Sequence, residues 1–151
     1  MYQPLQGVYQ FLVTGTALGT YDIDLSVTYK DGSVNVPISM NGIASRGSTA
    51  TYQVNLNTSP GGSTQVVRIA SFSVALADVN NSFLLGFVGN RTMANSLSKR
   101  IEAAQNAAQP ARNNILNAFK NEVTAQSGRQ ITGAASQVLL EDADYLLRQN
   151  P

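Results

Sequence analysis

The chain contains no cysteine, no histidine and no tryptophan among its 151 residues. Without cysteine it has no disulfide, no thiolate zinc site and no cysteine nucleophile. Without histidine it lacks the commonest general base and the commonest ligand of transition metals. These absences make catalysis the least favoured function, and we expect the chain not to be an enzyme.

Charge is also scarce, because only 13% of the residues are charged and the formal net charge is +1. The ten basic residues are scattered, and only Lys99 and Arg100 are adjacent. Nucleic-acid binding needs clustered lysine and arginine, so we expect no nucleic-acid partner. No apolar run approaches the roughly 18–20 residues of a membrane span. The N-terminus also lacks the pattern of a signal peptide, so a secreted origin requires this chain to be a piece of a longer one.

From Gly7 to about Leu76 hydrophobic residues recur at every second position, which is typical of strands. The clearest stretch is TYDIDLSVTY, where Tyr21, Ile23 and Leu25 alternate with Asp22 and Asp24. Further strands are expected in GVYQFLVTG, SVNVPISM, STATYQVNLN and STQVVRIASFSVAL. Pro37 predicts an edge strand, because proline cannot donate to a strand ladder. In the last stretch the apolar set shifts from Val67–Ile69 to Phe72–Leu76, which predicts a bulge near residues 70–71.

The hydrophobic period changes to three and four residues at Asp78, which we interpret as a helix N-cap. A second helix is expected with Thr92 as its N-cap, and Pro110 ends it or opens the third, which Gly128 ends. A fourth helix is expected to begin at Thr132. The predicted fold class is therefore α+β, an N-terminal antiparallel β-sandwich followed by a C-terminal three- to four-helix antiparallel bundle. The corresponding modules are residues 1–77 and 78–151.

The helical half carries a recognisable series of short motifs over residues 94–147. They are Ala94-Asn95-Ser96-Leu97, Leu116-Asn117-Ala118-Phe119, Glu122-Val123 and Ala125-Gln126-Ser127-Gly128, followed by Arg129 and Ile131. This series resembles the FIMAH-type helical module of large secreted bacterial proteins, here over residues ~78–148. The stretches GVYQFLVTG and GTYDIDLSVT are similar to β-sandwich modules that precede such helices. The resemblance implies an accessory module beside other domains of its parent protein, without catalytic residues.

Asp22 and Asp24 are the candidate metal ligands. At i and i+2 on a strand they share one face, with side chains roughly 7 Å apart. Together with Asp31 or loop carbonyls they could hold Ca²⁺, although a solvated face that discourages edge aggregation is the favoured explanation. A glycosidase pair is less favoured, because a polar strand face gives neither a cleft nor a raised pKa.

Three further groups of residues are candidates for chemistry. The cluster Glu141, Asp142 and Asp144 is interpreted as an exposed helix face that pairs with Lys or Arg of a neighbour. Ser96 and Lys99 match an S-x-x-K pattern but lack its companion motifs, so Lys99 is placed on the solvated face. The tyrosines Tyr2, Tyr9 and Tyr52 could form a sugar-stacking platform, but Tyr9 and Tyr52 fit core positions as well, and we favour the core.

Three functions remain open at this point. The first is a non-catalytic accessory module for spacing, packing or attachment in a secreted or cell-surface bacterial protein. The second is a module that binds carbohydrate or another cell-surface ligand on the sandwich, with calcium as a candidate cofactor. An enzyme ranks last.

Overall fold

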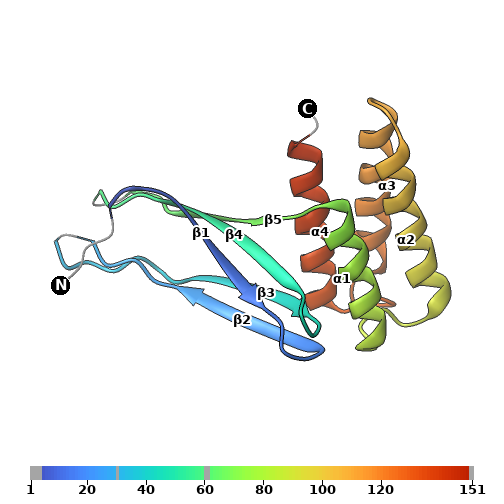
Figure 1. The fold of residues 1–151 in the computed structure, drawn as a ribbon, viewed down its shortest axis with the longest axis horizontal. Coiled ribbons are helices and arrows are strands. Elements are labelled where there is room, and N and C mark those ends of the chain that lie inside the picture. Colours follow the sequence, from blue (N-terminus) through green and yellow to red (C-terminus); the bar gives the residue numbers. More distant parts are fainter. Residues whose placement is uncertain (1–4, 30, 60–61, 150–151) are drawn as a thin grey trace.

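The computed structural model describes residues 5–29, 31–59 and 62–149, and in these residues strands come first and helices follow (Figure 1). The strands are β1 (Gly7–Thr14), β2 (Gly19–Leu25), β3 (Ile38–Ala44), β4 (Thr49–Leu56) and β5 (Gln65–Ile69). The helices are α1 (Phe72–Leu84), α2 (Arg91–Asn106), α3 (Ala111–Gln126) and α4 (Gly133–Arg148). The α+β class predicted from the sequence is confirmed.

The strands form two small antiparallel sheets. In one sheet β4 lies between β1 and β5, and in the other β2 pairs with β3. The alternation in β2 is as predicted, since Asp22 and Asp24 are exposed while the residues between and beside them are partly buried. Pro37 lies before β3 rather than within a strand. In the segment that precedes it, Val34 makes an isolated bridge to Thr28, and the Asn35 N–H donates to the Val27 carbonyl at 3.0 Å.

Aromatic side chains join the two sheets. Tyr52 of β4 is fully buried, stacks on Phe11 of β1 at 5.1 Å between ring centroids, and shares a 2.9 Å hydrogen bond with the Tyr21 hydroxyl of β2. Gly42 of β3 lies against the Tyr21 ring, because a Cβ added at Gly42 would lie 2.2 Å from Tyr21 Cζ. A small apolar core extends this contact, comprising Val27, Tyr29, Val54 and Leu56 with Phe11, Leu25 and Val66 packed against them.

The passage from strand to helix corrects the predicted boundary. The first helix begins at Phe72, six residues before Asp78, and Ser71 is its N-cap, with the Ser71 hydroxyl accepting from the Val74 N–H at 3.2 Å. The predicted bulge at residues 70–71 is therefore a strand end and a helix cap. The every-second-residue spacing of Phe72, Val74 and Leu76 is coincidental, because these residues lie in a helix. The fully buried core contacts of this helix come from Ala75 and Val79, which are one helical turn apart.

The other helix ends depend on local capping chemistry. The α2 N-cap is Asn90 rather than the predicted Thr92, because Asn90 Oδ1 accepts from the Met93 N–H at 2.9 Å. The last helix begins where the sequence predicts, and Thr132 caps α4 by accepting from the Ala135 N–H at 3.3 Å. Gly128 follows α3 with φ +74°, the left-handed conformation that ends many helices.

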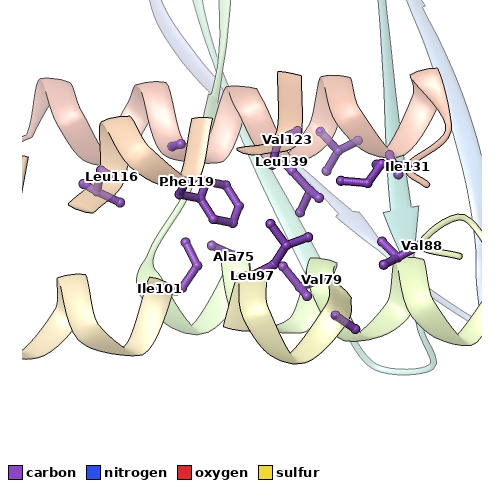
Figure 2. Packing of buried hydrophobic residues seen from close by; sticks show 14 of the residues in the cluster. Ala75, Val79, Val88, Leu97, Ile101, Leu116, Phe119, Val123, Ile131 and Leu139 are labelled. Atoms are coloured by element: carbon purple, nitrogen blue, oxygen red, sulfur yellow. The ribbon is translucent and has the colours of Figure 1, made fainter. Parts of the chain in front are cut away.

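The four helices enclose one apolar core (Figure 2). Each helix packs on the next along the chain, and α1 also packs on α4. Phe119 of α3 lies among Leu97 and Ile101 of α2 and Leu116, all with no exposed surface. Removing side chains of this size from a closed core destabilises a fold by several kcal/mol, about 3–5 kcal/mol for phenylalanine. In the described part of the chain, no helix is long and apolar enough to cross a membrane.

The helices rest on one end of the strands, and the strands project away from them (Figure 1). α4 contacts β3 and β5, and α1 contacts β3. Ile43 of β3, 3% exposed, belongs to the helical core rather than to the core between the sheets. Asn41 of β3 donates to Gln137 of α4 at 2.9 Å. The two halves predicted from the sequence thus share packed side chains.

Candidate functional site

Asp22 and Asp24, the candidate calcium ligands, lie on the exposed face of β2 as predicted. Asp24 Oδ1 accepts from the Ser39 hydroxyl at 2.6 Å. The third predicted participant, Asp31, has its carboxylate turned to Ser33, whose hydroxyl and backbone N–H donate to it at 2.6 and 3.0 Å. These hydrogen bonds, the hydroxyl first, lower the pKa of Asp31 below its usual value.

Calcium prefers six to eight oxygen ligands, of which the pair on β2 supplies side chains from two residues. No group of three or more histidine, cysteine, aspartate or glutamate residues suited to a metal ion occurs within residues 5–29, 31–59 and 62–149. Asp22 lines a hollow of about 270 Å³ between the β2–β3 sheet and α4, together with Asn41, Phe87 and Val138. Calcium at this pair remains a prediction.

The acidic residues of the last helix do not form one exposed face, so that interpretation is wrong for Asp142. Asp144 pairs with Lys120 of α3, as predicted for a helix face opposite a cation, and Glu141 accepts from Gln137 at 3.1 Å. Asp142 points the other way and is 1% exposed. The predicted cluster is therefore split between the surface and the interior.

Asp142 belongs to a buried ionic cluster at the junction of the strands and the helices. Arg68 of β5 donates through Nη2 to Asp78 Oδ2 of α1 at 2.5 Å and through Nη1 to Asp142 Oδ1 of α4. The three side chains are 2%, 5% and 1% exposed. Asp78, predicted as a helix N-cap, lies in the middle of α1 and contributes a buried carboxylate instead. One guanidinium thus holds two carboxyl groups from two different helices.

The charges of this cluster do not balance if both carboxylates are ionised. Burial raises the pKa of Asp142 well above its usual value, and the nearby Asp78 carboxylate adds to the increase, although Arg68 opposes it. Burial alone would lower the pKa of Arg68, but the two carboxylates outweigh that effect and raise it, so Arg68 stays charged. Asp142 Oδ2 is buried without a hydrogen-bond partner in the described structure. A proton on Asp142 would make the cluster neutral.

Two hollows border the cluster, since Arg68 lines both of them and Asp78 lines the first. One, of about 250 Å³, is lined by residues that include Tyr21, Ser48, Asp78 and Asn81. The other, of about 260 Å³, is lined by residues that include Ser39, Tyr52, Glu141 and Arg148. Asp78 and Asp142 are almost fully buried and bonded to Arg68, and burial at this junction is the main cause of the raised pKa of Asp142.

Ser96 also has a structural partner. Its hydroxyl donates to Glu122 Oε1 of α3 at 2.8 Å, and Arg100 Nε pairs with the other carboxylate oxygen. Lys99 is exposed, as predicted. Glu122 therefore links α2 to α3, and the Ser96 hydroxyl of the S-x-x-K pattern is engaged in a hydrogen bond to it.

The candidate sugar-binding tyrosines are separated by the structure. Tyr2 lies outside the described residues, and Tyr52 is fully buried, which confirms the core interpretation for that residue. Tyr9 is 42% exposed, so its predicted core position is wrong. Its hydroxyl donates to the Leu5 carbonyl at 2.5 Å, which holds the ring along the start of β1.

Sequence reasoning missed Arg68 because it placed Val67 and Ile69 on the core side of β5. In the structure the other set of β5 side chains faces the core, since Arg68 lies opposite the buried Tyr52 and Val66 lies opposite the buried Val54. A lone arginine inside the apolar stretch VVRIA was the available signal. A charged residue in the interior of a strand needs a partner, and the partners came from helices that the sequence could not position.

Comparisons with known proteins add no relative: no family model, no curated protein and no solved structure matches this chain.

Proposed function

We propose that this chain is a non-catalytic accessory module of a larger secreted or cell-surface bacterial protein. In this proposal the two sheets are the layers of a small β-sandwich carried on a four-helix bundle of the FIMAH type. The module spaces or attaches the other domains of its parent protein, which are its partners. It acts at the cell surface or in the medium.

The observation that carries the proposal is the position of Arg68 between Asp78 and Asp142. A buried arginine bonded to two helices resists their separation, because pulling either helix away leaves buried guanidinium N–H donors without an acceptor. The ionisable groups at the junction are thereby used for holding the halves together. A stiff unit with a helical base and projecting strands suits spacing and attachment.

Localisation tests the proposal directly. Antibodies raised against this chain are applied to intact cells of the source bacterium and to the culture medium. The proposal expects labelling of the intact cells, or the antigen in the medium, as part of a chain longer than 151 residues. Recovery of the antigen only from the cytosol of lysed cells, with a cytosolic enzyme as control, would contradict it.

A second candidate is carbohydrate binding on the strand half, and the exposure of Tyr9 favours it. Aromatic rings exposed on a sheet can stack on sugar rings, and Asp22 and Asp24 offer a place for calcium. A glycan array probed with calcium and with a chelator tests this function. Binding that Tyr9→Ala abolishes would support it, and an array without signal in both conditions would exclude this candidate for the glycans displayed.

A further inference from the structure

β1 is an edge strand without the features that usually keep edges apart. It pairs with β4 over eight consecutive residues and has no bulge. Its sequence GVYQFLVT contains neither proline nor a charged residue. The other edges differ, since β2 carries Asp22 and Asp24, β3 follows Pro37, and β5 has only five residues. Long, regular and uncharged edges are the ones that pair with another strand.

The same strand exposes more apolar surface than a solvated edge needs. Val8 is 66% exposed, Leu12 63% and Tyr9 42%. Val8 and Leu12 lie on the outer face of the sheet, with the exposed Gln10 between them. Tyr9 lies on the inner face, next to Phe11. Both faces of this edge strand therefore carry exposed apolar side chains that no part of the described chain covers.

We infer that β1 pairs with β1 of a second copy of this chain, antiparallel, about a twofold axis at Gln10. In that register Val8 lies opposite Leu12 of the second copy, and Gln10 lies opposite its own counterpart. On the inner face Tyr9 lies opposite Phe11. Each outward or inward side chain thus lies opposite one of its own chemical kind, aliphatic, amide or aromatic. Cross-strand pairs of these kinds are favourable.

Neighbouring registers do not give this match. An axis at Phe11 sets Leu12 opposite Gln10 and Val8 opposite Thr14, and an axis at Tyr9 sets Val8 opposite Gln10. An axis between two residues places outward side chains opposite inward ones, because the side-chain period of a strand is two. The pattern of β1 therefore fits itself in one antiparallel register.

The overall shape leaves room for the second copy. β1 ends near the helices, since Val13 lies in the hollow that also touches Asn81 of α1, and it begins at the far end of the projecting strands (Figure 1). An antiparallel partner therefore places its helices at the opposite end of the joined sheet. A twofold interface of this kind uses the same strand from both copies and closes as a dimer. The inference does not depend on the proposed accessory role.

Sedimentation equilibrium of the purified chain tests the pairing. Strand pairing alone makes a small interface, so a dimer with a dissociation constant on the order of 10–100 µM is expected. Gln10→Lys places two like charges opposite each other at the axis and is expected to weaken the dimer about tenfold or more. Gln53→Lys is the matched control, because Gln53 of β4 pairs with Gln10 within the chain. In the dimer the two Gln53 positions are about 14 Å apart, three strand spacings, beyond the screening length of physiological salt.

Cross-linking tests the register. Because the chain has no native cysteine, every cross-link must involve the introduced residue. Gln10→Cys is expected to form a cross-linked dimer with a short bismaleimide. Val8→Cys alone is expected to cross-link poorly, whereas a mixture of Val8→Cys and Leu12→Cys cross-links well. Circular dichroism confirms that each variant is folded. A chain that stays monomeric to about 1 mM, a dimer that Gln10→Lys leaves intact, or cross-linking of Val8→Cys to itself would each overturn the inference.

Discussion

Arg68 of the last strand bonds to Asp142 of the last helix, 74 positions later in the chain. The contact is buried at both ends, and the same guanidinium also holds Asp78 of the first helix. Buried ion pairs contribute little net stability relative to apolar side chains of the same volume, but breaking one partner away is strongly destabilising. This cluster therefore makes the strand half and the helical half depend on each other.

Replacing Arg68 with methionine should destabilise the whole chain. The substitution keeps much of the side-chain volume but leaves Asp78 and Asp142 buried without a cation, so a loss of about 3–5 kcal/mol in the free energy of unfolding is expected. Urea denaturation measures it. The triple variant Arg68→Met, Asp78→Leu and Asp142→Leu should recover most of the loss, because no buried charge remains. A loss below about 1 kcal/mol for the single variant, the size of a surface pair, would contradict the buried geometry.

The pH dependence of stability should reveal the proton on Asp142. Since the folded pKa of Asp142 is raised, the folded chain keeps a proton that the unfolded chain releases above about pH 4. The free energy of unfolding should therefore decline as pH rises from about 4 through the folded pKa. Asp31, whose pKa is lowered, is ionised in both states above about pH 5, so it adds nothing to the slope there.

Asp142→Asn, which imitates the protonated carboxyl, should flatten this decline, and urea denaturation across the pH series measures the difference. Asp144→Asn is the matched control, because Asp144 lies on the surface of the same helix beside Lys120. A decline that persists unchanged in Asp142→Asn would assign the titration to another group.

The sequence predicted those features whose cause is local. The alternation around Asp22 and Asp24 placed β2 correctly, and Thr132 and Gly128 marked the ends of two helices, because caps and strand faces depend on neighbouring residues. The boundary at Asp78 was wrong because Phe72, Val74 and Leu76 fit both periods over a short run. Only packing of Ala75 and Val79 against the other helices decides between them.

The ionic cluster was beyond sequence reasoning for a different reason. Arg68, Asp78 and Asp142 are brought together by the seating of α1 and α4 on the strands, which no local pattern encodes. The prediction assigned the wrong face of β5 to the core, an error of one residue. It therefore placed Arg68 in solvent, where an arginine needs no partner. Asp142 was then grouped with Glu141 and Asp144 by proximity in the chain, although the helix separates their directions.

Gly42 should not tolerate a side chain. A Cβ at Gly42 would overlap the Tyr21 ring, which is held by its hydrogen bond to Tyr52, so Gly42→Ala is expected to destabilise the chain by about 1–3 kcal/mol. Gly19→Ala is the matched control, because Gly19 lies in the partner strand with nothing within 4 Å of an added Cβ. Thermal unfolding of both variants measures the difference. Equal melting temperatures would show that Tyr21 is free to move.

Glu122 should matter more than its partly exposed position suggests. Its carboxylate accepts from Ser96 and pairs with Arg100, so Glu122→Ala removes two links between α2 and α3 and is expected to cost about 1–2 kcal/mol. Glu102→Ala serves as the control, since Glu102 is exposed on α2. Urea denaturation of both variants checks the prediction, and similar losses in the two would contradict it.

Unfolding followed by two probes tests most directly whether the strands and helices form one unit. Five of the six tyrosines precede residue 53 and there is no tryptophan, so tyrosine fluorescence reports mainly on the strands. Far-ultraviolet circular dichroism reports mainly on the helices. We expect coincident urea transitions in the natural chain, because the strands and helices share packed side chains and the Arg68 cluster. Two separate transitions, with the tyrosine signal lost while the helices remain, would contradict it.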